Sequence, residues 1–321
     1  MVATRSCLLL AGLPVLLAIG SAAALAEYPE RPIRIVVPFT PGGGTDIIAR
    51  ALGQHLNGVW GQNIIIDNRP GGNTIVASEI VARARPDGYT LIMQINSLTA
   101  LPAMPKEQGL GTISLDQFAP ITLVASLPHV LVVNRSVPAA TVKELVALAK
   151  TAPGKLNYAT PGIGTPVHLA GALFASMAGI NIVPVPYKGA AEYTAAVLGN
   201  HVQMVFGSAS TAIPHIRAGT FKALGVTPAK RIPQLPDVPA IAEVYPGYDI
   251  VSWYGVLAPA KTPDAVVAKL AKEIAAATKT KSFTDVLPDY EMIGNTPAQF
   301  AAFLRKDAEM STRLIAQSGA K

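Results

Sequence analysis

Cysteine is almost absent: the 321 residues contain one, Cys7, and it lies in the first 26 residues. The rest of the chain therefore has no disulfide, no thiol nucleophile and no cysteine ligand for a metal. The five histidines do not show a paired spacing such as H-E-x-x-H. The sequence therefore gives no signal of a metal site, and we expect no cofactor.

Charged residues are also scarce, at 14% of the chain against a usual share of about 25%. The formal net charge is +6, but the basic residues are scattered, without a cluster of five or more. This distribution does not resemble a nucleic-acid patch, so we expect no nucleic acid as a partner. A mildly positive field suits a small anionic partner instead.

Long hydrophobic runs are confined to the amino terminus. Residues 1–26 carry one charge, at Arg5, an apolar stretch from Leu8 to Ile19, and Ala24-Leu25-Ala26 before Glu27. These features are the n-region, h-region and cleavage site of a signal peptide. A membrane anchor is the alternative, but the stretch is short and interrupted by glycine and proline. We predict removal of residues 1–26 and export of the rest.

Strand-like and helix-like segments alternate along the remaining chain. Strands are expected at residues 33–37, 63–67, 89–94, 130–133, 156–160, 202–206 and 222–226. Thr141, Thr262 and Thr296 each begin a helix, by a capping box or by a proline at the first helical position. This alternation predicts an α/β fold with parallel sheets, either one wide sheet or two smaller ones.

Two extended stretches that contain proline, residues 118–134 and 227–248, are predicted to cross between two lobes. The chain length allows two such units. The predicted lobe 1 is discontinuous and consists of residues 27–125 plus 228–321. The predicted lobe 2 consists of residues 126–227.

Each predicted lobe has one glycine-rich turn between a strand and a helix. These turns are PFTPGGGTD, residues 38–46, and YATPGIGTPVHLAG, residues 158–171. Glycine lets the backbone approach a ligand, and the first amides of the following helix are unpaired and partly positive. We predict that the amides of residues 42–45 face a bound carboxylate; a mere tight turn is the alternative. The signatures of dinucleotide and phosphate loops are incomplete, which argues against a nucleotide.

The two turns belong to a longer series of segments: PIRIVVPFTPGGGTDIIARALGQHL, IDNRPGGN, ARPDGYTL, YATPGIGTPVHLAG, VPYKGAA, LGNHVQMVF, PHIRAGTFKALGVT and LPDVPAIAEVYPGYDIVSWYGVLAPAKTP. In this order, and over nearly the whole chain after residue 26, the sequence resembles the Bug-type solute-binding proteins of tripartite tricarboxylate transporters. The resemblance implies an α/β, two-lobe periplasmic-binding-protein fold with a ligand cleft between the lobes. It also implies a periplasmic, non-enzymatic protein, which we expect to be a monomer, that delivers a small carboxylate to membrane transporter subunits or to a sensor kinase.

The resemblance further implies a ligand site made of backbone amides, hydroxyls and ordered water. Carried over to this chain, the expected residues are Phe39, Thr40, Pro41, Gly42, Gly43, Gly44 and Thr45 in lobe 1, and Thr160, Pro161, Gly162, Gly164 and Thr165 in lobe 2. Asn96, Ser97 and Tyr187 are expected to line the same cleft. Asp46 is more simply a helix-capping residue, and ligand contacts by His168 and Lys188 stay open.

Two positions depart from the family pattern. Gly207-Ser208 follows Phe206, where the family often has an acidic residue, so a ligand with an amino group is less expected. Pro184 stands before Val-Pro-Tyr, where the family usually has histidine.

An exported α/β hydrolase is the main alternative from another class. Ser97, His168 and Asp46 could be drawn as a triad, but no G-x-S-x-G elbow exposes a serine. Trp253 and Tyr254 lie in an apolar run and are expected in the core or between the lobes.

Overall fold

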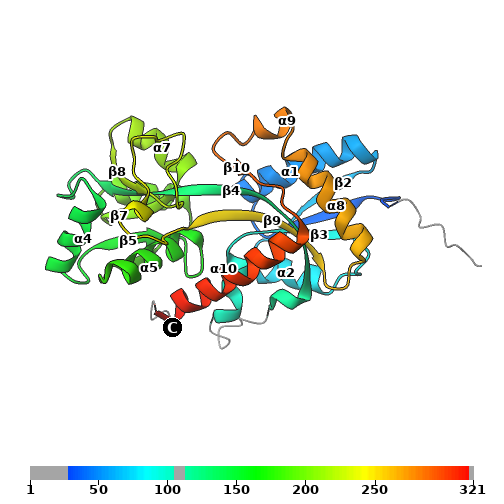
Figure 1. Cartoon of the computed structure of the whole chain (residues 1–321), viewed down its shortest axis with the longest axis horizontal. Coiled ribbons are helices and arrows are strands. Elements are labelled where there is room, and N and C mark those ends of the chain that lie inside the picture. Colours follow the sequence, from blue (N-terminus) through cyan, green and yellow to red (C-terminus); the bar gives the residue numbers. More distant parts are fainter. Residues whose placement is uncertain (1–27, 105–112, 318–321) are drawn as a thin grey trace, which may run out of the picture.

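The computed structural model describes residues 28–104 and 113–317, so the predicted signal peptide lies outside the described residues. The molecule is elongated, and two lobes are joined by two long strands (Figure 1). Ten strands form one connected sheet, in the order β2-β1-β3-β9-β4-β7-β5-β6, and β10 and β8 also pair with β4.

Lobe 1 is built on parallel strands that alternate with helices. Its elements are β1 (Ile33–Val37), α1 (Gly44–Trp60), β2 (Ile64–Asn68), α2 (Ile75–Ala82), β3 (Thr90–Gln94) and α3 (Ser97–Ala100). β1 pairs in parallel with both β2 and β3, and the antiparallel strand β9 (Val251–Pro259) continues the sheet beside β3. The strands of this sheet carry buried apolar residues on both faces. This pattern is expected, because the crossover helices cover both faces of a parallel sheet.

Lobe 2 repeats this plan. Its elements are α4 (Val142–Thr151), β5 (Asn157–Thr160), α5 (Pro166–Ala178), β6 (Val183–Pro186), α6 (Ala190–Leu198), β7 (Met204–Ser208), α7 (Ala209–Arg217) and β8 (Phe221–Val226). β5 pairs in parallel with β6 and β7. The edge strand β6 was not predicted, because its two prolines weaken the strand signal.

Strand β4 (Phe118–Asn134) passes through both lobes as one unbroken strand of 17 residues. Its first part pairs with β9 and with β10 (Glu291–Met292), whereas its last part pairs with β7 and β8. Pro128 does not interrupt the strand but lies within it, opposite Val251. The alternation therefore predicted the parallel parts, and the antiparallel strands that join the lobes make the sheet mixed.

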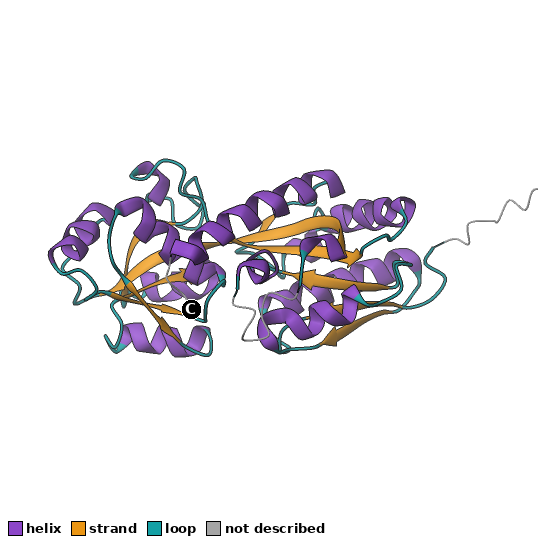
Figure 2. Cartoon of the chain, turned by 90° about the horizontal axis from the view of Figure 1, so that it is seen from below, coloured by secondary structure: helices purple, strands orange, loops and turns teal. Residues whose placement is uncertain are grey.

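The carboxyl-terminal helices complete lobe 1 and then reach lobe 2. They are α8 (Asp264–Ala277), α9 (Lys281–Thr284) and α10 (Pro297–Gln317). α10 contacts α3 of lobe 1 and α5 of lobe 2, and Figures 1 and 2 show it running along the molecule past the junction of the lobes. Single 3-10 turns lie at Gly72–Thr74, Leu101–Ala103, Leu115–Gln117 and Ile241–Glu243. The described helices are nowhere both long and apolar enough to cross a membrane.

The predicted helix starts have different outcomes. The Thr141 hydroxyl accepts from the Glu144 amide, and the Thr296 hydroxyl accepts from the Gln299 amide, which confirms both caps. The prediction for Thr262 is wrong, because α8 begins after Pro263 and the Thr262 hydroxyl donates to the Pro259 carbonyl instead.

The segment from Pro228 to Ile250 was assigned to lobe 1, but it packs against lobe 2. The Tyr248 hydroxyl donates to the Ala170 carbonyl, and the Tyr245 ring meets Phe174 at 6.0 Å. We therefore propose that lobe 2 extends to about Ile250 and that β9 carries the chain back to lobe 1.

Candidate functional site

The first glycine loop lies between β1 and α1. Gly42 has a φ of 90°, which favours glycine, whereas Gly43 is extended with a φ of −80°. In the described residues, the amides of Gly43, Gly44 and Thr45 donate to no other group, because α1 begins here and its first bond runs from Ile47 to the Gly43 carbonyl. Pro41, Gly42 and Gly43 are exposed, whereas Gly44 is half-buried and Thr45 is buried, so the series of three unpaired amides begins at the exposed end of α1.

Asp46 braces this loop from inside. Its carboxylate accepts from the Gly42 amide at 3.0 Å, from Arg50 at 2.8 Å and from Asn68 at 3.0 Å. Burial alone would raise the pKa of Asp46, but these hydrogen bonds lower it below its usual value. The Gly42 amide is therefore occupied by the protein's own carboxylate, which corrects the expectation that all four amides from Gly42 to Thr45 are free for a ligand.

Two tyrosine hydroxyls lie against the loop. A Cβ atom at Gly44 would overlap the Tyr290 hydroxyl and come within 3.1 Å of the Tyr254 hydroxyl. The two rings are 5.5 Å apart, and burial raises the pKa of both residues. Both hydroxyls therefore stay protonated near neutral pH. Gly44 is needed for this close approach rather than for a positive φ.

The second glycine loop lies between β5 and α5. Gly162 and Gly164 have positive φ values of 138° and 76°. The Thr160 hydroxyl accepts from the Gly162 amide, and the Thr165 hydroxyl accepts from the His168 amide and donates to the Gly162 carbonyl. Most polar groups of this loop are thus paired within the loop. It offers fewer unpaired amides than the first loop.

The second loop touches lobe 1. A Cβ atom at Gly164 would overlap the methyl group of Met104 and come within 2.8 Å of the Ala100 Cβ. Ala100 and Met104 follow Ser97 in the turn after β3. The structure therefore brings the second loop next to the segment that carries the predicted Asn96 and Ser97.

Asn96 and Ser97 have different environments. The Asn96 side chain is buried and donates to the Val251 carbonyl while it accepts from the Trp253 amide, so it ties this turn to β9. The Ser97 hydroxyl is buried and has no hydrogen-bond partner among the described residues. Ser97 thus has a free hydroxyl, whereas the polar groups of Asn96 are already used.

Polar side chains also gather where β7 meets β4. Ser208 lies opposite His129 in the strand register, and its hydroxyl is 2.8 Å from that of Thr211. Burial raises the pKa of Tyr193, although hydrogen bonds with Ser208 and Thr211 oppose the rise. This position carries hydroxyls and no carboxylate, in keeping with the departure at Gly207-Ser208.

His129 connects this region to β9. Its Nδ1 lies 3.0 Å from the Phe206 carbonyl oxygen and donates to it. Because the proton of the neutral ring is then on Nδ1, Nε2 accepts from the Ser252 hydroxyl at 2.7 Å. Burial lowers the pKa of His129 to about 4. The ring is therefore neutral at pH 7 and serves as a hydrogen-bonded link between strands.

Tyr187 and Lys188 lie just after β6. Tyr187 is partly buried against the apolar core and donates its amide to the Thr160 carbonyl. Lys188 is exposed, and its amide donates to Glu192. Phe39 is half-buried and Thr40 exposed, so both remain accessible beside the first loop.

The suggested triad is not assembled. Asp46 binds Arg50, and among the described residues neither the Ser97 hydroxyl nor the His168 Nε2 atom has a hydrogen-bond partner. Burial lowers the pKa of His168 to about 4. The described part of the chain also lacks a group of three or more His, Cys, Asp or Glu side chains able to hold a metal.

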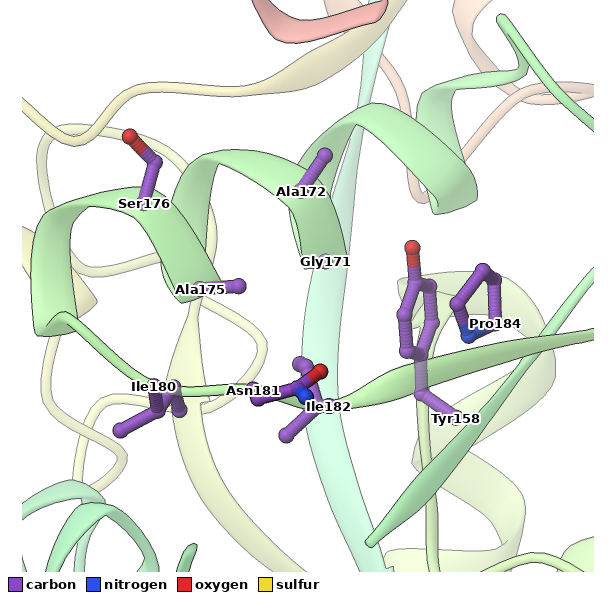
Figure 3. A pocket seen from close by; sticks show the side chains of 9 residues that line it. All are labelled: Tyr158, Gly171, Ala172, Ala175, Ser176, Ile180, Asn181, Ile182 and Pro184. Carbon is purple, nitrogen blue, oxygen red and sulfur yellow. The ribbon is translucent and has the colours of Figure 1, made fainter. Parts of the chain in front are cut away.

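A separate cavity of about 340 Å³ lies between α5 and β6 in lobe 2. Figure 3 shows the Tyr158 ring standing beside Pro184 below α5. A Cβ at Gly171 would overlap that ring, so glycine allows the helix to approach β5 closely. Tyr158 and Gly171, at the two ends of the second glycine segment, line the cavity, but the predicted ligand-binding residues of that segment do not.

Tyr254, Tyr290 and Tyr193 lie near the candidate site, although the sequence did not predict them there. Tyr254 was expected only in the core or between the lobes, and the other two were not singled out. Their proximity depends on the β9 register and on the turn before β10, neither of which has a local sequence signal. The glycine pattern alone identified the two loops.

The two lobes, their parallel strands and the paired strand-to-helix loops define the two-lobe fold of periplasmic binding proteins. Among solved structures, the periplasmic binding protein BugD matches with a TM-score of 0.76 and 31% identity, over 92% of this chain and 99% of that chain. R. palustris Rpa4515 with adipate matches with a TM-score of 0.78 and 32% identity, over 91% of this chain and 99% of that chain.

Sequence comparison gives the particular family. The model of the tripartite tricarboxylate transporter family receptor, TctC, matches residues 48–320. The chain is also 35% identical over 318 residues to the UPF0065 protein in the tcbD-tcbE intergenic region of Pseudomonas sp. (strain P51), covering 96% of this chain and 93% of that protein. The chain therefore belongs to the tripartite tricarboxylate transporter receptor (TctC) family, which confirms the resemblance and the two-lobe α/β fold.

Proposed function

We propose that this protein captures a small organic carboxylate between its two lobes and delivers it to a tripartite tricarboxylate-type transporter. The observation that carries the proposal is the set of unpaired amides at Gly43, Gly44 and Thr45 at the start of α1. Such amides attract an anion through hydrogen bonds and the helix dipole, without a lysine or arginine. Adipate in the similar structure Rpa4515 is a ligand of this class.

The surroundings of these amides supply further donors. The neutral hydroxyls of Tyr254 and Tyr290 lie beside Gly44. Ser97, Thr160, Thr165 and Tyr187 stay candidates for the remaining contacts, together with Pro161, Gly162 and Gly164 of the second loop. Asn96 holds the turn after β3 in place. Binding requires no cofactor, and the unassembled triad argues against a hydrolase.

Location and partners complete the proposal. Residues 1–26 direct export and are removed before Glu27, so the protein works in the periplasm. There it acts as a monomer. Mass spectrometry of periplasmic protein would contradict this if the intact amino terminus were found. Uptake of labelled ligand by cells with and without the protein tests delivery to a transporter; delivery to a sensor kinase instead would leave uptake unchanged.

A thermal-melting panel tests the ligand class. It compares adipate, citrate and benzoate with adipamide, which has the length of adipate without its charges. A ligand at about one hundred times its Kd adds roughly 2.7 kcal/mol to the free energy of unfolding. If no carboxylate raised the melting temperature while an ester was hydrolysed, the enzyme alternative would replace this proposal.

A further inference from the structure

A second cavity, of about 600 Å³, lies where β4 and β9 pass between the lobes. We call it the crossover groove. Its floor includes Ser126, Pro128, Val251 and Trp253, and the register places Ser126 opposite Trp253 and Pro128 opposite Val251. Residues opposite each other in neighbouring strands share a face of the sheet, so the floor is one face of these two strands.

The crossover groove opens on the other face of β9 from the proposed carboxylate site, and Tyr290 borders both, because it lines the groove while its hydroxyl lies beside Gly44. Trp253 lines the groove, whereas the hydroxyl of its strand neighbour Tyr254 lies beside Gly44. Successive side chains of a strand point to opposite faces. The described residues of the two glycine loops do not line the groove.

The walls of the groove come from both lobes. One wall is the segment from Pro228 to Gln234, which leaves lobe 2 after β8. The opposite wall includes Asp289 to Glu291 at the start of β10 in lobe 1, and Phe303 of α10 adds a third side. An occupant of the groove would therefore respond to any rotation of one lobe against the other.

The polar groups of the groove are mainly acceptors. Asp249, Asp289 and Glu291 line it, although the chain as a whole carries a formal net charge of +6. The basic lining residues are Lys230 and Arg231, of which Arg231 is held by Glu243 at 2.7 Å. The Lys306 charge also acts on Asp249.

Among the described residues, the acceptors Asp249 and Glu291 each accept one hydrogen bond from a neighbour, and the Gln234 oxygen accepts none. The Asp249 carboxylate accepts from the Ala229 amide at 3.1 Å, and that of Glu291 accepts from the Ser126 hydroxyl at 3.2 Å. Each carboxylate keeps capacity for another donor. The Gln234 side-chain oxygen is buried without a hydrogen-bond partner in the described residues.

Aromatic side chains supply the rest of the lining. Trp253, Tyr290 and Phe303 line the groove. Trp253 is fully buried with its ring against Phe300 and Phe303, whereas Tyr290 and Phe303 are partly exposed. Aromatic faces of this kind attract cations and flat apolar groups. The volume is in the range of small-molecule sites, about 300–1,000 Å³. We propose that the crossover groove binds a small organic cation, in which an ammonium group is attached to an aromatic or aliphatic body.

Fluorescence of Trp253 provides a direct test with phenethylammonium as the probe. The chain has two tryptophans, Trp60 and Trp253, so Trp60→Phe leaves one reporter in the groove. We expect saturable quenching or a spectral shift with phenethylammonium, and a response at least about tenfold weaker with phenethyl alcohol, which lacks the charge. Equal responses, or none up to millimolar concentrations, would overturn the proposal.

Paired variants locate the binding. Asp249→Asn and Glu291→Gln keep the shape of each side chain, and each should raise the Kd for phenethylammonium about tenfold. Glu273→Gln makes the same chemical change on α8 outside the groove and should leave the Kd unchanged. Gly43→Val should also leave it unchanged, so the result is independent of carboxylate binding. Equal losses in all four variants would mean non-specific attraction and refute the site.

Discussion

Gly43→Val separates a ligand-binding role of the first glycine loop from a purely structural one. Gly43 has a φ of −80° and a ψ of 167°, which any residue adopts. A Cβ built there has only the Thr40 carbonyl oxygen nearby, at 3.9 Å. The fold therefore leaves room for a side chain at this position, and a side chain would occupy the space in front of the free amides.

The expected change in stability is small. Valine is a poorer N-cap residue than glycine, by up to about 1 kcal/mol. Lower entropy of the unfolded chain offsets this by roughly 0.4–1 kcal/mol. The free energy of unfolding should therefore change by less than about 1 kcal/mol.

The expected change in affinity is much larger. Loss of one or two charge-assisted contacts, worth roughly 1.5–3 kcal/mol each, weakens carboxylate binding by about tenfold to about 20,000-fold. Calorimetric titration with adipate, or with the best ligand of the melting panel, measures this Kd. Gly58→Ala is the control, because it lies exposed on the same helix with no atom within 4 Å of the added Cβ. A destabilised Gly43→Val protein with unchanged affinity would remove this loop from the site.

Three further predictions concern stability and the contact between the lobes. His129 and His168 are both buried with a pKa of about 4, so the contribution of each is complete above the unfolded value near 6.5 and is lost as the pH falls toward 4. Urea unfolding should show a loss of roughly 2 kcal/mol from each histidine between pH 8 and pH 5, and a flat profile would contradict this. Asp307 accepts from the Trp253 indole at 2.8 Å. Asp307→Leu should therefore lower the free energy of unfolding by about 1–3 kcal/mol, and Asp307→Asn, which keeps an acceptor oxygen, should lower it much less. Equal losses for both variants in urea unfolding would show that the acceptor at residue 307 is unimportant. Gly164→Ala should push the second loop away from Met104 and lower the affinity for the ligand. Adding Met104→Ala to the same chain should restore part of that affinity. If titration showed that the double variant binds no better than Gly164→Ala, the contact would not matter for binding.

Local patterns predicted the regular parts of the fold. The expected strand at residues 33–37 is β1 as observed, and the glycine turns precede α1 and α5 as expected. These elements depend on apolar runs, turns and caps, which the sequence displays directly. The short strand β10 and the placement of residues 228–250 depend on tertiary pairing, for which no nearby residue carries a signal.

Register limited the prediction of the site in the same way. Trp253 and Tyr254 are consecutive, yet one faces α10 and the crossover groove while the other faces Gly44. A shift of one residue in the pairing of β9 would exchange these roles. The sequence therefore identified the loops, whereas the hydroxyls beside them required the three-dimensional structure.

Asp46 explains how an acidic residue can stand in a proposed anion site. Its carboxylate is turned inward to the Gly42 amide, and Arg50 neutralises its charge at 2.8 Å. Because these bonds lower the pKa of Asp46, the pair stays ionised at neutral pH and adds no net charge to the start of α1. The same bonds hold Gly42 at its positive φ, from which the chain continues into the unpaired amides of Gly43 to Thr45. The acidic residue thus shapes the loop, and in the proposed site recognition of the anion would be left to neutral donors: the amides and the tyrosine hydroxyls.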